Sequence, residues 1–377
     1  MNIVIGILSF AIYLYMVMMI FYIIKIFIRK RISNHASQNP AISIVVAMRN
    51  EASHISNLIN AVCKQKYNAP FEIIVVDDNS TDDSIARSNE ALQNNLPTKF
   101  QILKLSDVQQ SGKKQAVAYG ISHATHEVIV CTDADCQMGE YWLQSMAHYF
   151  VEFKCKLLAG PVCINSGTLL EKMQTIEMAS LQGLTAASIF AGKPLMCNGA
   201  NMMFDKKRYL SLQQIFLANK NPSGDDVHLL YEISRQLDAV AYAFDKSAVV
   251  YTSGVTTISE LINQRTRWAG KINYTVPLHV YLPGISIFCG NVAVLFSFAL
   301  LLTPNWNNAV LIILIKFVID WLLYIASSKF AGKLKFAIFP FCCTFFAYPF
   351  YSVAIGINVL RKQYTWKGRV INLRNQK

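Results

Sequence analysis

Four long apolar segments constrain this chain more than any other feature of its sequence. Residues 3–28 are almost wholly apolar, and their one charge, on Lys25, lies near enough to the end for its ammonium to reach the membrane surface. Three further apolar segments follow at residues 278–302, 309–326 and 336–360. A helix rises about 1.5 Å per residue, so segments of this length suit a hydrocarbon layer of about 30 Å. We therefore predict one N-terminal and about three C-terminal membrane helices in a multi-pass protein.

The basic charge of the chain lies beside these apolar segments. The sequence has 35 Lys and Arg against 23 Asp and Glu, a net charge of +12. Arg29, Lys30 and Arg31 follow the first segment directly, and no Asp or Glu occurs after Trp321. Basic residues next to a membrane helix set its orientation and attract anionic headgroups. We therefore expect no nucleic-acid partner, and we place the region after residue 31 in the cytoplasm, at the inner (cytoplasmic) membrane of the cell.

The number of crossings leaves one question of topology open. A cytoplasmic middle region followed by three full crossings would leave the basic tail, residues 361–377, outside. The positive-inside rule disfavours that arrangement. One late segment would then be interfacial or re-entrant, either the one that contains Pro283 or the one that contains Pro340 and Pro349.

The middle of the chain alternates between strand and helix patterns. The expected strands lie at residues 42–47, 71–76, 100–105 and 127–132, and the expected helices at 52–64 and 113–123. Continuous β-branched strands that alternate with helices predict a parallel sheet covered by helices on both faces. Ligands bind to such sheets beyond the carboxyl ends of the strands.

Acidic residues follow two of these strands. Asp77 and Asp78 come after the second, and Asp133 and Asp135 come after the fourth. Two carboxylates that converge without a cation repel each other, which raises a pKa. Mg²⁺ or Mn²⁺ relieves that repulsion and is bound by carboxylates together with substrate phosphate oxygens. The sequence therefore predicts a site for a divalent cation and a phosphate at this edge of the sheet.

Three later motifs add polar groups suited to a ligand site. The turn NGAN at residues 198–201 lets backbone come close to a ligand. SGDD at 223–226 precedes a helix expected from near Val227, and its carboxylates either do chemistry or cap that helix. QRTRW at 264–268 lies on a helix expected from near Thr257. Its arginines suit phosphate and its indole suits a sugar ring, although an Arg and a Trp beside a membrane also serve as interfacial anchors.

Taken together, the motifs VVDDNS, TDADC, SGDD and QRTRW, in this order over residues 42–270, resemble the family 2 glycosyltransferases. The similarity is strongest to the membrane-embedded branch of hyaluronan, cellulose and poly-N-acetylglucosamine synthases, whose QxxRW signature QRTRW matches. The resemblance implies an α/β, Rossmann-like GT-A fold and a hexosyltransferase that transfers sugar with inversion from a nucleotide sugar, usually a UDP-sugar. The expected domains are an anchor at 1–31, a GT-A domain at 32–277, membrane segments at 278–360 and a basic tail at 361–377.

The resemblance also implies a role for individual residues. Asp226 would be the general base and Asp135 the metal ligand. Residues that would bind the nucleotide sugar are Ala47, Glu51, Asp78, Lys113, Asp133 and Arg267. Residues that would bind the acceptor are Asp225, Gln264 and Trp268. The motif departs from the family pattern at Asp225, where many relatives have Glu, but the second carboxylate is the implied base.

Several functions remain open at this point. The resemblance favours transfer of a sugar to a membrane lipid or a glycan acceptor, with Mg²⁺ or Mn²⁺ as cofactor. A processive polysaccharide synthase would use the same residues. A catalytically inactive scaffold of a membrane complex would not need a competent residue in every motif. A nucleotidyltransferase would also use paired aspartates, but it gives no reason for QRTRW before a membrane segment.

Overall fold

The computed structural model describes residues 2–29, 39–93, 99–217, 224–235, 239–270, 277–330, 337–361, 363–366 and 369–372. Lys30, Arg31 and part of the basic tail (residues 362, 367–368 and 373–377), which bear on the expected topology, lie outside these residues. The chain divides into two compact units. The first comprises Met1–Arg29, Ile164–Leu195 and Gly254–Lys377, and the second comprises Lys30–Cys163 and Met196–Ser253.

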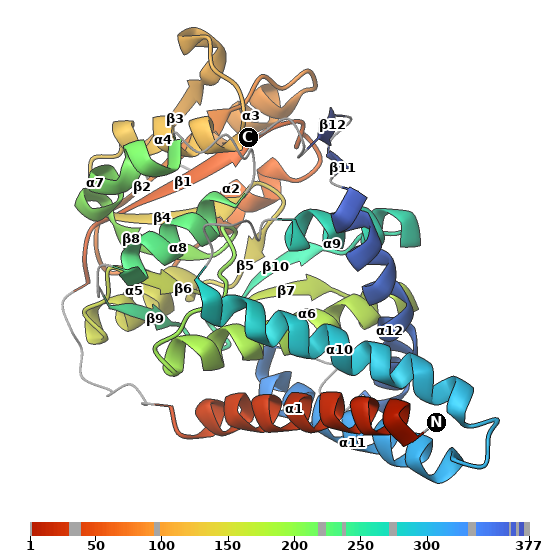
Figure 1. Cartoon of the computed structure of the whole chain (residues 1–377). Coiled ribbons are helices and arrows are strands. Elements are labelled where there is room, and N and C mark those ends of the chain that lie inside the picture. Colours follow the sequence, from red (N-terminus) through yellow and green to blue (C-terminus); the bar gives the residue numbers. More distant parts are fainter. Residues whose placement is uncertain are drawn as a thin grey trace. The chain divides into compact units, whose positions relative to one another are not determined.

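The second unit is built on a sheet that has seven strands among the described residues, in the order β3-β2-β1-β4-β8-β6-β9 (Figure 1). The strands are β1 (Ile42–Met48), β2 (Phe71–Asp77), β3 (Lys99–Lys104), β4 (Val128–Asp133), β6 (Leu157–Ala159), β8 (Met202–Asp205) and β9 (Val240–Tyr242). β1 pairs in parallel with β2 and β4, and β2 pairs in parallel with β3. β8 is antiparallel to β4 and β6. The parallel sheet expected from the sequence is therefore confirmed, with β8 as an antiparallel insertion.

Helices cover both faces of this sheet (Figure 1). They are α2 (Ile55–Cys63), α3 (Ser84–Gln93), α4 (Lys113–His123), α5 (Trp142–Glu152), α7 (Lys206–Leu217) and α8 (Asp225–Arg235). On one face, Ile44 and Val46 of β1 share a buried core with Leu58 of α2 and Trp142 of α5. On the other face α4 packs so closely that a Cβ at Gly120 would lie 2.6 Å from Cγ1 of Val45. Alternate side chains of β1 thus point to opposite faces of the sheet, one covered by α2 and α5 and the other by α4.

Strand register brings the acidic strand ends together. Ala47 lies opposite Asp133 across the β1–β4 pair, and Met48 lies opposite Asp77 across the β1–β2 pair. The short strands β5 (Gln137–Met138) and β10 (Val250–Ser253) pair antiparallel next to this edge, with Val250 opposite Met138. The sheet therefore gathers the carboxyl ends of β1, β2 and β4 at one edge.

The first unit is mainly helical. Its elements are α1 (Asn2–Phe27), β7 (Val162–Asn165, which begins in the second unit), α6 (Leu169–Phe190), α9 (Ile258–Ala269), α10 (Leu278–Leu300), α11 (Trp306–Ser327), α12 (Ile338–Arg361), β11 (Gln363–Trp366) and β12 (Arg369–Asn372). Among the described residues, four helices are long and apolar enough to cross a membrane, namely α1, α10, α11 and α12. This confirms one N-terminal and three C-terminal candidate spans. Pro283 and Pro349 lie inside continuous helices.

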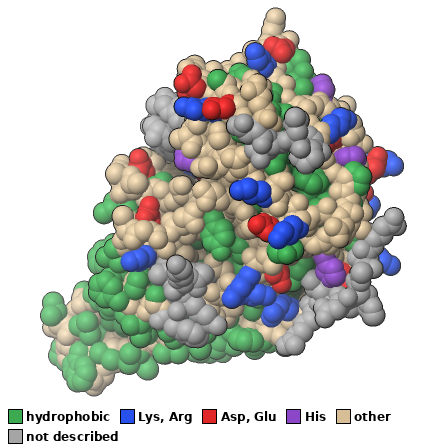
Figure 2. Space-filling view, turned by 180° about the vertical axis from the view of Figure 1, so that it is seen from behind, with side chains coloured by type: hydrophobic (Ala, Val, Ile, Leu, Met, Phe, Trp, Pro, Cys, Tyr) green, Lys and Arg blue, Asp and Glu red, His purple; other side chains and the backbone are tan. Residues whose placement is uncertain are grey.

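Three of the candidate membrane helices, α1, α10 and α11, pack through small and apolar side chains. Leu8 and Ile12 of α1 lie in one buried cluster with Ala293 of α10 and Ile312 of α11. Their outer surfaces expose large apolar side chains instead, such as Phe10 of α1. Figure 2 shows hydrophobic side chains gathered over the outer ends of these helices. Apolar surface of this extent is typical of contact with lipid.

Candidate active site

Asp78 is held at the carboxyl end of β2 by backbone and side-chain hydrogen bonds. Its N–H donates to the carbonyl oxygen of Met48 over 2.8 Å, which joins the ends of β1 and β2. Its Oδ1 accepts a hydrogen bond of 2.7 Å from the N–H of Gly112, and Arg49 donates to its carbonyl oxygen over 2.9 Å. The residue is 2% exposed. Its carboxylate is thus fixed before any ligand binds.

Lys113 lies at the first turn of α4 and pairs with Asp133 at the end of β4. Gly112 precedes it with φ of +106°, a backbone conformation that favours glycine. Burial disfavours the charged form of Lys113 and is the largest single effect on its pKa, but the charge and hydrogen bond of Asp133, together with nearby acidic residues, raise that pKa above its ordinary value. The other acidic residues that contribute are Asp225 and Asp226, whose charges also raise the pKa of this lysine. Lys113 is therefore a cation that lies among the carboxylates of several acidic residues.

Asp135 is the second carboxylate of the TDADC motif. Its Oδ2 accepts a hydrogen bond of 2.9 Å from Oγ1 of Thr252, on β10. Burial raises the pKa of Asp135, and the charges of Asp133 and Glu51 raise it further. The repulsion expected from the sequence between Asp133 and Asp135 is therefore present in the structure.

The donor set of this cluster fits a hard divalent cation that a substrate completes. Asp133 and Asp135 supply carboxylate oxygens, the ligands that Mg²⁺ and Mn²⁺ prefer. Within the described ranges, no group of three or more His, Cys, Asp and Glu side chains converges as a complete metal cage. A cation here would therefore need further oxygen ligands from a phosphate or from water.

Asp225 and Asp226 occupy the first turn of α8, which begins two residues earlier than the sequence suggested. Gly224, with φ of +101°, turns the chain into the helix at that point. Oδ2 of Asp226 accepts a hydrogen bond of 3.1 Å from the N–H of Gly199, and its Oδ1 accepts one of 2.9 Å from Val227. The NGAN turn thus lies against the Asp226 carboxylate, which these donors orient and the helix dipole stabilises in its ionised form.

The QRTRW motif lies on α9, in the first unit. Thr257 is the N-cap of α9 and forms a capping box with Glu260, so the helix start expected from the sequence is confirmed. The guanidinium carbon of Arg265 lies 4.1 Å from the centroid of the Trp268 ring. Gln264, Arg267 and Trp268 therefore belong to one unit, and the other predicted site residues belong to the second unit.

Three groups that orient side chains of the predicted motifs were not named as such from the sequence, although a motif pointed to one of them. Thr252 holds Asp135, and nothing in its sequence context distinguishes it from any threonine in a strand. The N–H of Gly199 contacts Asp226, and the NGAN turn was the signal that pointed to it. Glu177 pairs with Arg265, and its place inside a long helix gave no signal.

Known proteins similar to this chain are glycosyltransferases. The family model "Glycosyl transferase family group 2" matches residues 128–351, more than half of the chain, and "Glycosyl transferase family 2" matches residues 43–210. The poly-beta-1,6-N-acetyl-D-glucosamine synthase of Staphylococcus epidermidis is 26% identical over 245 residues, which are 63% of this chain and 56% of that protein. The same enzyme of Staphylococcus aureus strain COL is 24% identical over 252 residues, 65% of this chain and 58% of that protein. The chain thus matches less than two thirds of these relatives' length.

A solved structure supports the same fold. The mannosyltransferase PcManGT from Pyrobaculum calidifontis, in complex with GDP-Man and Mn²⁺, superposes with a TM-score of 0.56 and 16% identity, covering 94% of this chain and 99% of that one. This similarity confirms the GT-A fold that the sequence motifs implied. With a family model that spans more than half of its residues, the chain belongs to glycosyl transferase family group 2.

Proposed function

We propose that this protein is an inverting glycosyltransferase that moves a sugar from a nucleotide sugar, most simply a UDP-sugar, to a membrane lipid or glycan acceptor. The observation that carries the proposal is the cluster at the strand ends, where Lys113 lies among the carboxylates of Asp133, Asp225 and Asp226. A diphosphate leaving group needs a cation beside it, and an acceptor hydroxyl needs a base. The cluster supplies both kinds of group in the second unit.

The donor is held by residues at the ends of β1, β2 and β4. On this proposal Ala47 and Glu51 line the nucleotide pocket, and the fixed carboxylate of Asp78 accepts hydrogen bonds from the base. The ammonium of Lys113 exchanges its contact with Asp133 for the diphosphate. Because Lys113 keeps its charge, it binds phosphate as a point cation.

Asp135, with Asp133 beside it, would hold Mg²⁺ or Mn²⁺. When bound, the metal ion neutralises charge on the departing diphosphate. Support comes from the raised pKa of Asp135, from the oxygen-only donor set and from PcManGT, whose structure contains Mn²⁺ and GDP-Man.

Asp226 acts on the acceptor. Its carboxylate takes the proton of the acceptor hydroxyl while the acceptor oxygen bonds to the anomeric carbon and the bond from that carbon to the diphosphate breaks. The products are a nucleoside diphosphate and a glycosylated acceptor with inverted configuration. Asp225, Gln264 and Trp268 bind the acceptor on this proposal, and Arg267 binds the diphosphate.

We expect Trp268→Ala to harm use of the acceptor more than binding of the donor. An indole face stacks on a sugar ring or a lipid headgroup, whereas contacts to phosphate belong to Arg267 and the metal. The measurement is the dissociation constant of UDP beside the turnover rate. A loss of UDP affinity that parallels the loss of turnover would show that Trp268 serves the donor or the fold.

A processive polysaccharide synthase is the second candidate within the same chemistry. It is favoured by the similarity to the poly-beta-1,6-N-acetyl-D-glucosamine synthases, of whose length the chain matches 58% in one case. The test is to incubate membranes that contain the protein with a panel of radiolabelled nucleotide sugars and to separate lipid from polymer fractions. Label in a lipid fraction supports single transfer, label in polymer supports the synthase, and label in neither contradicts the proposed function.

We further propose that the second unit faces the cytoplasm, where nucleotide sugars are made, and that the membrane is the inner membrane of the cell. The support is the basic group that follows α1, of which Arg29 is the one residue that the structure describes. By the positive-inside rule, basic residues at the end of a membrane helix lie on its cytoplasmic side. A protease site inserted near Asn95 should stay uncut by external protease in intact cells and be cut in lysed cells. Cleavage in intact cells would overturn this topology.

A further inference from the structure

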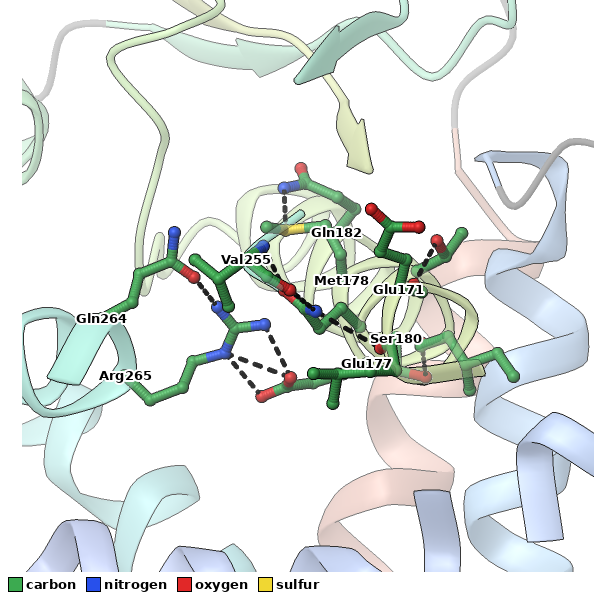
Figure 3. Close-up of polar contacts among 12 residues, drawn as sticks. Glu171, Glu177, Met178, Ser180, Gln182, Val255, Gln264 and Arg265 are labelled. Atoms are coloured by element: carbon green, nitrogen blue, oxygen red, sulfur yellow. Dashed lines mark hydrogen bonds and ion pairs between the residues drawn. The ribbon is translucent and has the colours of Figure 1, made fainter. Parts of the chain in front are cut away.

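We propose that Glu177 is a positioning residue that acts through Arg265 to hold Gln264 and Trp268 in their working orientation. This role rests on the proposed function, because Gln264 and Trp268 are the residues proposed to bind the acceptor. Glu177 lies on α6 and Arg265 on α9, two helices of the first unit (Figure 3). Glu177 touches neither substrate nor metal on this account, so its effect on the reaction is indirect.

The contact between the two residues is a buried, directional ion pair. Nε of Arg265 lies 3.1 Å from both carboxylate oxygens of Glu177, and Nη2 lies 2.8 Å from Oε2. Arg265 is 4% exposed and Glu177 is 8% exposed. A guanidinium bound along one edge by a carboxylate is fixed in its plane as well as in its position.

The remaining surfaces of the same guanidinium contact the two acceptor residues. Nη1 of Arg265 donates to Oε1 of Gln264, and the guanidinium carbon lies 4.1 Å from the Trp268 ring centroid. One side chain therefore bonds to Gln264 and stacks on Trp268 while Glu177 holds it. The orientation of both residues follows from the Glu177 carboxylate.

A second contact shows that α6 serves as the platform for this region. Nε2 of Gln174 donates to the carbonyl oxygen of Val255 over 2.8 Å, and the N–H of Val255 donates back to Oε1 of Gln174 over 3.1 Å. Val255 lies just before the N-cap of α9. Helix α6 thus fixes the chain before α9 through Gln174, and it fixes α9 itself through the ion pair between Glu177 and Arg265.

Stability alone is a weak reason for such a pair. A buried ion pair often contributes little compared with apolar side chains of similar size, whereas loss of one partner leaves a costly buried charge. A purely structural role predicts that variants without an unpaired buried charge keep normal transfer activity. The positioning role predicts that the same variants lose transfer activity. Those variants decide the test.

The variants separate geometry from charge. Arg265→Lys keeps the ion pair with Glu177 but loses the planar contacts to Gln264 and Trp268. The double variant Glu177→Met with Arg265→Met removes both charges, so it avoids an unpaired buried charge. Glu177→Gln removes one charge and Glu177→Asp keeps it. The matched control is Asp320→Asn, which disturbs another ion pair of the first unit, the one between Lys316 and Asp320 at 2.6 Å.

Activity is measured as sugar transfer to the acceptor in membranes against hydrolysis of the same nucleotide sugar by water, together with the dissociation constant of UDP in the presence of Mn²⁺. We expect Arg265→Lys and the double variant to express well and to bind UDP within about twofold of wild type. Transfer should fall by about 10-fold or more, because small misplacement of reacting groups has effects of this size. Hydrolysis should persist, so the ratio of hydrolysis to transfer rises. Glu177→Asp should fall between these variants and wild type.

A spectroscopic readout does not depend on activity. Quenching of Trp268 fluorescence by acrylamide is obtained as the difference between each protein and its Trp268→Phe counterpart. Quenching should increase in Glu177→Gln and Arg265→Lys and stay at the wild-type value in Asp320→Asn. If Glu177→Gln expresses poorly, the charge-balanced variants give the same comparison.

The outcomes separate this inference from the proposed function. Wild-type membranes that transfer no sugar from any nucleotide would contradict the proposed function, whatever the fluorescence shows. Wild-type transfer combined with an unchanged ratio of hydrolysis to transfer in Arg265→Lys and the double variant would leave the function standing and overturn the positioning role. An unchanged Trp268 environment in Glu177→Gln would also overturn it.

Discussion

Asp226→Asn is expected to lower turnover by roughly 10²-fold or more, the usual cost of losing a general base. Asparagine is nearly the same size, and its amide oxygen can still accept one of the two hydrogen bonds that Gly199 and Val227 donate to the separate carboxylate oxygens of Asp226. The fold and the affinity for UDP should therefore stay close to those of wild type. The measurement is the turnover of both proteins beside their UDP dissociation constants and their expression in membranes.

Asp225→Asn is the matched control for that substitution. It makes the same chemical change one residue away, in the same first turn of α8. We expect a smaller loss of turnover, because Asp225 is proposed to contact the acceptor rather than to take its proton. Near-wild-type turnover in Asp226→Asn, or a loss explained by poor expression, would mean that the pair only caps α8.

The second large effect concerns the divalent cation. Activity should require Mg²⁺ or Mn²⁺, and Asp135→Asn should abolish most of it, because loss of one carboxylate weakens a site that substrate phosphate completes. The measurement is transfer activity in EDTA, followed by titration with each metal ion. Asp135→Asn should also need a higher concentration of metal ion than wild type for whatever activity remains.

Asp107→Asn serves as the control for the loss of one negative charge. Asp107 is exposed in the second unit, in a short 3₁₀ turn after β3. Its substitution should leave the metal requirement unchanged. Full activity of the wild-type protein in excess EDTA would show that the Asp133 and Asp135 cluster works without a metal ion.

Much of the second unit was predictable because its strands are buried on both faces and read as continuous apolar runs. The expected strand at residues 42–47 is β1 (Ile42–Met48), and the expected helix at 113–123 is α4 (Lys113–His123). Carboxyl ends of parallel strands meet at one edge, which is why the acidic residues after two strands were expected at the same edge, whereas the strand order that places Ala47 opposite Asp133 came from the structure. Helix α2 begins at Ile55, later than expected, because the N–H of His54 bonds to the carbonyl oxygen of Glu51 in a turn.

Contacts between distant segments were beyond the reach of sequence patterns. The sequence pattern of helix α6 does not indicate which elements it packs against. In the structure, its residues Ile176 and Ala179 share a buried cluster with Tyr324 of α11 and Phe341 of α12. Residues 164–195 therefore group with the candidate membrane helices in the first unit, whereas the sequence suggested one continuous domain from 32 to 277. The partners of single polar residues, such as Glu177 for Arg265, depend on this tertiary packing.

The configuration of the newly formed glycosidic bond tests the central claim most directly. A single displacement, with Asp226 as base and a diphosphate as leaving group, inverts the anomeric carbon. With a donor whose sugar is α-linked to the diphosphate, proton NMR of the product should therefore show a β-linked sugar, formed by the wild-type protein and nearly absent with Asp226→Asn. An α-linked product would contradict the account, because retention requires a different mechanism.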